Sequence, residues 1–297
     1  MRSVKYYILN SSCILMWIVF NLKRFFPDKF YLKIIYRIRF GCKLNLGCPK
    51  GFNEKLNWLK LYDRNPFYTK LADKYAVKEY ITATIGKQYV VPCYGVWESF
   101  NAIDFSKLPQ QFVLKTNHDS SGVTIVLDKT KFDNKGKKNF YNKLLKRNWF
   151  YPLREWPYKN IVPRIFAEQF LDEGTGKELS DYKFWCFNGV PKVMYITNKG
   201  KEIYENFYDM DFNPLDIDHG FPRKEPEYAV PLHFDEMKKL ASHLSKGFPF
   251  IRIDFFLIGE KIYFGEFTFY DWGGIKPLNR KWEEKVGDWI DLSLIQN

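Results

Sequence analysis

The sequence predicts an α+β fold, because two apolar segments form β-hairpins while most other stretches have helical periodicity. The first hairpin pairs residues 112–116 with 123–127 across a polar turn. The second pairs residues 251–258 with 261–270 across a Gly-Glu turn. With 46% hydrophobic and 27% charged residues, the chain of 297 residues has the composition of a globular protein.

The other elements follow from hydrophobic spacing and turn residues. A helix is expected where apolar residues recur about every 3.6 positions, and a strand where β-branched and aromatic residues form short runs. Helices are therefore expected within residues 1–50 (two basic amphipathic ones) and at 53–62, 66–85, 131–148, 234–247 and 278–290. Further strands are expected at 88–97, 161–170 and 181–199, with loops at 149–160 and 209–232.

Most of the positive charge lies at the N-terminus. Residues 1–50 contain ten Lys or Arg and one acid, whereas the whole chain has a net charge of +12. The same segment has an apolar run of 15 residues at 6–20. A spanning helix needs about 20, and no signal-peptide cleavage site follows the run. Two interpretations stay open: the segment docks on the anionic cytoplasmic face of a membrane, or it packs on the core with its charges in solvent.

The cysteines and the charge pattern exclude several classes of protein. The five cysteines are scattered and form no C-x-x-C, so neither a disulfide framework nor a structural zinc site is expected. This pattern is typical of a reducing cytoplasm. Outside the N-terminus no basic stripe with interleaved aromatics occurs, so nucleic acid is not an expected partner. We expect a cytoplasmic protein, with peripheral attachment to the inner face of the cytoplasmic membrane as the open question.

The second hairpin contains acidic residues inside apolar strands. Asp254 lies in the middle of the first strand and Glu266 in the second, with Thr268 on the same side as Glu266. Symmetry about the turn places the two acids opposite each other. Paired carboxylates in a low-dielectric sheet repel, and Mg²⁺ would remove that cost. The alternatives are an exposed strand face, or an ion pair with Arg252 or Lys261.

The first hairpin resembles a phosphate-binding flap. Lys115 ends an apolar strand, and the small-residue turn that follows could wrap phosphate oxygens with the backbone N–H groups of Ser120, Ser121 and Gly122. Neither the P-loop pattern nor G-x-G-x-x-G is present. A plain hairpin remains the alternative interpretation.

Several short motifs occur in one order along the chain. In sequence they are Phe52-Asn53-Glu54-Lys55-Leu56, Asp73-Lys74 with Lys78, Leu108-Pro109, the lysine flap, Ala167-Glu168-Gln169-Phe170-Leu171, Asp181-Tyr182-Lys183 and the Asp…Glu-x-Thr hairpin. This order resembles the ATP-grasp superfamily, and most closely the TupA-like (teichuronopeptide biosynthesis) proteins of bacterial surface-polysaccharide clusters. The resemblance covers about residues 40 to 280.

The resemblance implies an ATP-grasp fold, in which two α/β subdomains grip ATP between antiparallel sheets, plus a basic N-terminal helical segment. The expected division is 1–50 for that segment and 51–297 for the catalytic domain. Within the catalytic domain, 51–105 is an N-terminal part, 106–172 an ATP flap subdomain and 173–297 a metal-binding subdomain.

The resemblance also implies roles for particular residues. Nucleotide binding would fall to Lys74, Lys115 and Lys183, to the flap residues His118, Ser120, Ser121 and Gly122, and to an adenine hinge of Glu168, Gln169, Phe170 and Leu171. Arg252 and Lys183 would be catalytic, beside the transferred phosphoryl group. Mg²⁺ would be held by Asp254, Glu266 and Thr268.

Some of these assignments have open alternatives. The family's usual third metal ligand is Asn, so Thr268 departs from the pattern. Lys183 could be a surface strand residue and Glu168 an edge-strand charge. Lys78 could be a helix-face charge, and His118 a loop hydrogen-bond donor.

The chemistry implied is carboxylate activation with ATP and Mg²⁺ as cofactors. The resemblance points to a carboxylate–amine ligase that forms an acylphosphate and attaches an amino acid or amine to a sugar or uronic acid of a surface polymer such as capsule, O-antigen or a teichuronopeptide. Its partners would be small carboxylates, amines and a sugar or polysaccharide acceptor. Two alternatives stay open: a glycosyltransferase, for which D-x-D occurs only at 209–211 and 216–218 in an expected loop, and a degenerate nucleotide-binding scaffold.

Overall fold

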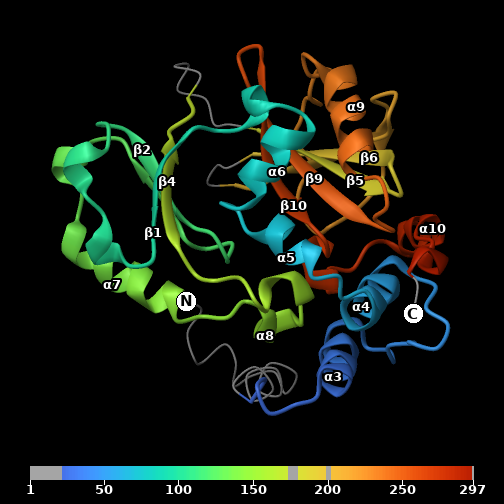
Figure 1. Ribbon diagram of the computed structural model, residues 1–297. Coiled ribbons are helices and arrows are strands. Elements are labelled where there is room, and N and C mark those ends of the chain that lie inside the picture. Colours follow the sequence, from blue (N-terminus) through green and yellow to red (C-terminus); the bar gives the residue numbers. More distant parts are fainter. Residues whose placement is uncertain (1–21, 173–179, 199–201, 296–297) are drawn as a thin grey trace.

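The computed structural model describes residues 22–172, 180–198 and 202–295. Two antiparallel sheets with helices beside them confirm the predicted α+β class. Figure 1 shows the smaller sheet and the larger sheet on opposite sides of the molecule, with short helices between them. Each sheet has its own hydrophobic core, so the two form separate lobes.

The smaller sheet contains the predicted flap hairpin. Its strand order is β1 (Cys93–Trp97), β4 (Ile165–Gln169), β2 (Phe112–Thr116) and β3 (Val123–Val126). All its pairs are antiparallel. Helix α7 (Asn134–Leu145) packs on it and contributes to a core that contains Phe100, Phe112, Leu114, Tyr141, Leu144, Ile165 and Ala167. The sheet takes its edge strand from residues before 106, the expected start of the flap subdomain.

The larger sheet contains the predicted acidic hairpin. Its order is β10 (Lys261–Thr268), β9 (Ile251–Ile258), β5 (Asp181–Phe187), β6 (Val190–Thr197), β7 (Glu205–Tyr208) and β8 (Pro214–Leu215). Glu266 lies directly opposite Asp254, as the turn symmetry predicted. A bulge between Phe264 and Glu266 requires Gly265, where a Cβ atom would come within 3.0 Å of the Asp254 carbonyl oxygen. Helix α9 (Phe234–Leu244) packs against β5 and β6 (Figure 1).

The single helix predicted over 66–85 is wrong, because the structure has two helices there. These are α5 (Phe67–Ala72) and α6 (Val77–Thr84). The Asp73 carboxylate accepts the N–H groups of Tyr75 and Ala76 at 2.9 and 3.0 Å, which starts a new helix. In the break, the N–H of Lys74 donates to the Asn117 carbonyl of the flap lobe at 3.0 Å. The break therefore directs Lys74 to the junction of the two lobes.

The remaining helices surround these lobes. They are α3 (Asp28–Phe40), α4 (Phe52–Tyr62), α8 (Phe150–Leu153) and α10 (Arg280–Trp289). Short 3₁₀ turns occur at Lys87–Tyr89, Phe100–Ala102, Phe105–Lys107, Lys129–Lys131, Trp156–Tyr158, Asp271–Gly274 and Leu292–Leu294. The predicted loop at 149–160 thus contains a short helix and a 3₁₀ turn, and the predicted loop at 209–232 contains β8. Helix α3 is one of the two helices expected in 1–50, and the apolar run at 6–20 lies outside the described residues.

Candidate active site

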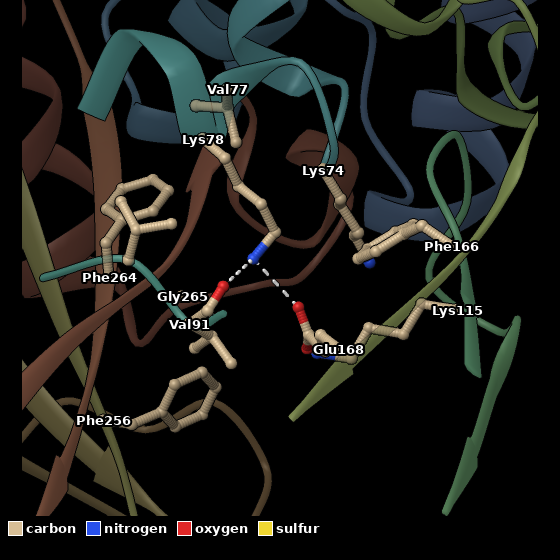
Figure 2. A pocket seen from close by; sticks show the side chains of 11 residues that line it. Lys74, Val77, Lys78, Val91, Lys115, Phe166, Glu168, Phe256, Phe264 and Gly265 are labelled. Carbon is tan, nitrogen blue, oxygen red and sulfur yellow. Dashed lines mark hydrogen bonds and ion pairs between the residues drawn. The ribbon is translucent and has the colours of Figure 1, made fainter. Parts of the chain in front are cut away.

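A cavity lies between the two sheets (Figure 2). It has apolar walls and several ammonium groups, and its lining is Lys74, Val77, Lys78, Val90, Val91, Lys115, Phe166, Glu168, Phe256, Phe264 and Gly265. The space between these residues is about 410 Å³ when the open solvent at its mouth is counted. Apolar walls beside positive charge suit a flat ring that carries anionic groups.

Positive charge exceeds negative charge in this cavity. The buried carboxylate of Glu168 forms ion pairs with Lys115 and, at 3.0 Å, with Lys78. Lys78 also donates to the Val91 carbonyl at 2.9 Å (Figure 2). Burial would raise the pKa of Glu168, but Lys115 and Lys78 lower it below its usual range. An ionised Glu168 therefore balances only one of the two lysines, and Lys74 adds a third ammonium group to the lining.

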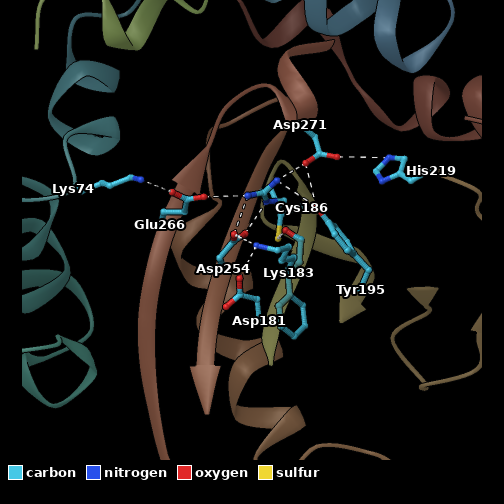
Figure 3. A network of polar contacts seen from close by, with 11 residues as sticks. Lys74, Asp181, Lys183, Cys186, Tyr195, His219, Asp254, Glu266 and Asp271 are labelled. Atoms are coloured by element: carbon cyan, nitrogen blue, oxygen red, sulfur yellow. Dashed lines mark hydrogen bonds and ion pairs between the residues drawn. The ribbon is translucent and has the colours of Figure 1, made fainter. Parts of the chain in front are cut away.

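Lys74 connects the flap lobe to the acidic hairpin. Its ammonium donates to the Asp119 carbonyl of the flap at 2.8 Å and lies 3.5 Å from a carboxylate oxygen of Glu266. Burial alone would raise the pKa of Glu266, but Lys74, Arg252 and Lys183 together lower it to about 2. Figure 3 shows the network that continues from Glu266 into the larger sheet.

Arg252 is the centre of that network. Its buried guanidinium binds Asp254 through two hydrogen bonds, Nε to Oδ1 at 2.7 Å and Nη2 to Oδ2 at 2.8 Å. It also donates to Asp271 at 2.5 Å, to Glu266 at 3.2 Å and to the Tyr195 hydroxyl at 3.2 Å. Three carboxylates therefore orient one guanidinium, whose fork geometry matches a phosphoryl group as well as it matches a carboxylate.

Negative charge exceeds positive charge in this network, the reverse of the cavity. Lys183 lies 2.5 Å from Asp254 and 3.4 Å from Asp181. The carboxylates are Asp181, Glu205, Asp254, Glu266 and Asp271, and the permanent cations are Lys74, Lys183 and Arg252. Such an excess of anions in a buried site favours binding of a cation.

His219 ends the network on the loop between β8 and α9. Its buried ring lies between Glu205, 3.0 Å from Nδ1, and Asp271, 3.8 Å from Nε2. The Tyr195 hydroxyl donates to the same Asp271 at 3.2 Å. The sequence did not indicate His219, Asp271 or Tyr195, because their contacts depend on how the loop folds over the sheet. Lys78 was assigned no role either. It lies at the start of α6, whereas Lys74 lies in the break before that helix, and both line the cavity.

The donor chemistry of the hairpin fits magnesium. Asp254 and Glu266 both approach Arg252, and Thr268 lies opposite Arg252 in the register. In the part of the chain that the structure describes, no group of three or more His, Cys, Asp or Glu side chains is arranged to hold a metal ion. Magnesium is usually bound by one or two carboxylates together with substrate phosphates. Two acids beside a lysine-lined cavity suffice for that kind of site if the cavity binds phosphates.

The backbone N–H groups of the flap turn, which were expected to bind phosphate, form hydrogen bonds within the turn itself. The N–H groups of Ser121 and Gly122 donate to the Asp119 carboxylate at 2.8 and 2.7 Å, and Ser120 is exposed. His118 is buried, with its ring nitrogens 3.3 Å from Asn117 Oδ1 and 3.1 Å from the Leu144 carbonyl. The structure therefore does not bring His118 to the cavity.

Only the first residue of the predicted hinge lines the cavity. Glu168 does so, whereas Gln169, Phe170 and Leu171 follow at the end of β4. The N–H of Gln169 donates to the Pro92 carbonyl at 2.9 Å, so this group is engaged by the chain itself. The hinge roles of these three residues stay predictions.

Both D-x-D sequences are engaged in contacts within the protein. Asp209 accepts the N–H groups of Asp211 and Asn213 at 2.9 and 2.8 Å. Asp216 accepts the Trp282 indole N–H at 2.6 Å, and Asp218 accepts the Gly220 N–H at 2.6 Å. They act as turn and packing residues.

Comparison with solved structures finds distant similarity to a ligase and a synthetase. D-alanine–D-alanine ligase from Bacillus anthracis complexed with ATP has a TM-score of 0.40 and 17% identity, over 82% of this chain and 69% of that chain. D-cycloserine synthetase DcsG has a TM-score of 0.42 and 12% identity, over 89% and 76%. These values are too low to transfer a substrate or a site residue.

Comparison of sequences gives the family directly. No curated protein matches the chain. The family model described as TupA-like ATPgrasp matches residues 54–291, which is most of the sequence. The fold and the lysine-lined cavity agree with that match. The chain therefore belongs to the TupA-like ATP-grasp family.

Proposed function

We propose that the protein is a carboxylate–amine ligase that activates its carboxylate substrate as an acylphosphate, in the biosynthesis of a bacterial surface polysaccharide. The observation that supports this most is the junction of two oppositely charged sites. A cavity with excess lysine meets a hairpin network with excess carboxylate, and Lys74 contacts both. Phosphates would bind on the first side and their cation on the second.

The reaction has two steps. A carboxylate oxygen of the substrate attacks the γ-phosphorus of ATP, the bond to the bridging oxygen breaks, and ADP leaves. The amine then attacks the acyl carbon, the carbon–oxygen bond to phosphate breaks, inorganic phosphate leaves, and the nitrogen loses a proton. The protein needs mainly to hold the groups in line and to stabilise negative charge.

The roles follow from position. Lys115, Lys78 and Lys74 would bind phosphate oxygens, and the apolar cavity walls would hold the purine. Arg252 and Lys183 would stabilise the phosphoryl group in transfer. Asp254 and Glu266 would hold Mg²⁺ with the phosphates, and the ion would neutralise the charge that develops on the transferred oxygens.

The acceptor side is a proposal from family membership. A sugar or uronic acid that receives an amino acid or amine fits a ligase of the TupA-like family. The two D-x-D sequences do not favour a glycosyltransferase, since Asp209 and Asp216 are engaged in contacts within the protein. The proposed division of the chain is the one given by the sequence, with 1–50 as the N-terminal segment.

The decisive experiment is a screen for ADP release with amino acids and uronic acids as substrates, followed by trapping with hydroxylamine. We expect ADP release only when a carboxylate acceptor and Mg²⁺ are present, and a hydroxamate of that acceptor when hydroxylamine replaces the amine. Transfer of sugar from a nucleotide sugar without ATP would overturn the proposal.

Attachment to an anionic membrane surface is a second part of the proposal. Helix α3 buries Tyr31, Leu32, Ile35 and Tyr36 against the protein. It exposes Lys29, Lys33 and Arg37, which lie four residues apart on one stripe. Within the described ranges no helix is long and apolar enough to cross a bilayer. The helix thus combines a packed face with a basic face that anionic lipids would attract.

Liposome flotation tests this part. The triple change Lys29→Gln, Lys33→Gln and Arg37→Gln should weaken binding to anionic vesicles about 10-fold or more, since each basic residue contributes about 1 kcal/mol at most. The matched control is Lys131→Gln, Lys135→Gln and Lys138→Gln, which removes the same charge from exposed positions on the flap lobe. Equal loss in both triples would show that only net charge matters.

A further inference from the structure

An exposed tryptophan lies in an uncommon backbone conformation directly after the acidic hairpin. Trp272 has φ 47° and ψ 29°, the left-handed region, and its side chain is 43% exposed. A bulky residue is an outlier there, and such outliers cluster at functional sites. An indole that protrudes into solvent contributes little to a core, so packing alone does not explain the residue.

The turn that carries Trp272 is fixed on both sides. Asp271, the residue before it, is buried and bound to Arg252 at 2.5 Å. The Gly273 carbonyl accepts from the buried Lys60 ammonium at 2.5 Å, and the Gly274 carbonyl accepts from Asn57 at 2.6 Å. The indole is therefore presented by a rigid turn, which is how binding surfaces are pre-organised.

A second aromatic ring and a cation lie beside the indole. The Phe221 ring is 5.4 Å from the Trp272 ring, centroid to centroid. The Lys276 ammonium lies 4.0 Å from the Phe221 ring and 4.8 Å from the Trp272 ring. Among the described residues no carboxylate lies within 4.0 Å of this ammonium, so an anionic group of a ligand could pair with it.

These three residues border the proposed reaction centre. The Trp272 ring lies 6.5 Å from the His219 ring, and His219 contacts the Asp271 that binds Arg252 (Figure 3). Burial lowers the pKa of Lys276, and Asp271 is among the acids that act against this lowering, so the ammonium is in electrostatic range of the network. The two rings are connected to Arg252 through the buried side chains of His219 and Asp271.

We infer that Trp272, Phe221 and Lys276 form the acceptor subsite, and that its ligand is an acidic sugar ring. The apolar C–H face of the sugar would lie on the indole, and its carboxylate would pair with Lys276. The ring bound here would therefore be a neighbouring unit of the acceptor, and not the unit whose carboxylate is activated. This inference rests on the proposed function and names the residues that select its acceptor.

The experiment measures binding of glucuronate and of glucose by ligand-observed NMR in the presence of Mg²⁺ and a non-hydrolysable ATP analogue. Wild type should bind glucuronate at least about 10-fold more tightly than glucose, since one ion pair in a partly buried site is worth roughly that factor. Trp272→Ala should lose both sugars. Lys276→Met should lose the preference for the acid and keep weak binding of both.

Matched controls separate this role from general effects. Lys192 lies 4.8 Å from the Trp289 ring, the same separation as Lys276 from Trp272, so Lys192→Met removes an equivalent contact elsewhere. Phe67 is 43% exposed, like Trp272, so Phe67→Ala removes an equally exposed ring. Both controls should bind glucuronate as wild type does. Trp272→Gly relieves the left-handed strain, so it should lose the sugars while its melting temperature changes by no more than about 2–4 °C.

The outcomes distinguish this inference from the proposed function. Unchanged glucuronate binding in Trp272→Ala and Lys276→Met, or equal binding of glucose and glucuronate by wild type, overturns the subsite and leaves the ligase proposal standing. Absence of sugar binding by wild type overturns the subsite as well. Selective sugar binding without any release of ADP would support the subsite and count against the ligase.

Discussion

The two sides of the site differ in the sign of their excess charge. In the flap cavity Lys115 and Lys78 share the single carboxylate of Glu168. In the hairpin network the carboxylates outnumber the permanent cations, and several of them converge on Arg252. Neither arrangement is stable by itself in a buried setting. The difference supports the proposal that the site binds a pair of opposite charges, a polyphosphate and its metal ion, rather than either alone.

Lys74 is the structural link between the two sides. It reaches the flap through the Asp119 carbonyl and the hairpin through Glu266. If the lobes close on a nucleotide, the movement would change the contacts of Lys74 with both charge clusters. Substitutions that remove charge from one cluster at a time should therefore separate their contributions.

The largest effect is expected from Glu266→Gln, which removes a negative charge from the hairpin and keeps the shape. Turnover should fall by about 10³-fold or more, because the carboxylate both orients Arg252 and would hold Mg²⁺. ADP formation and hydroxamate trapping measure it, and circular dichroism should still report a folded chain. The exposed Glu260→Gln in the turn of the same hairpin is the control. Full turnover by Glu266→Gln would falsify the metal assignment.

Lys115→Met removes positive charge from the cavity side. Affinity for ATP should fall by about 10²-fold, since one pre-organised phosphate donor is lost. Lys107→Met, on a fully solvated lysine of the same lobe, should have no effect. Isothermal titration with ATP and Mg²⁺ measures both variants. An unchanged ATP titration for Lys115→Met would reject this cavity as the nucleotide site.

The sequence predicted the hairpin side of the site better than the cavity side. The pairing of Asp254 with Glu266 follows from the turn and from strand alternation, which are local properties. The helix break at Asp73 was missed, since hydrophobic periodicity continues through it while the Asp73 carboxylate binds the N–H groups that follow and starts a new helix. His219 could not be found, because a loop far along the chain carries it to Asp271.

The engagement of the flap turn could not be predicted either. Small residues at 120–122 favour a nest of N–H groups, but the same residues equally favour a turn closed by the preceding Asp119. The local sequence is compatible with both an open nest of N–H groups and a closed turn. Which of the two forms depends on contacts with the rest of the lobe. For this reason the roles of Ser120, Ser121 and Gly122 stay predictions.

The smallest effect is expected from Glu155→Gln, and it concerns stability rather than turnover. Glu155 is a buried carboxyl near the hairpin network. Burial raises its pKa to about 7, against lowering by Lys60 and Arg252, while Glu266 and Asp271 raise it further. An unfolded glutamate titrates near about 4.3. Between about pH 4.5 and pH 7, Glu155 is therefore protonated in the folded chain and ionised in the unfolded chain.

Glu155 lowers the stability of the folded chain as the pH rises. Below about pH 4.5 Glu155 is protonated in both the folded and the unfolded state, so it has no effect on the free energy of unfolding. As the pH rises toward 7 the folded state becomes less stable relative to the unfolded state, and this loss is complete above the pKa of Glu155 in the folded chain. Wild type should therefore lose stability relative to Glu155→Gln between pH 5 and 7. The gain of the variant should reach about 1–2 kcal/mol at pH 7.5, less than the full pKa difference implies, because Lys60 loses its neighbour. Urea unfolding at several pH values measures this, with the exposed Glu98→Gln as control. If the free energy of unfolding of wild type and of Glu155→Gln changes with pH in the same way, the buried acid on this side does not destabilise the folded chain. The charge asymmetry between the two sides would then have no measurable effect on stability.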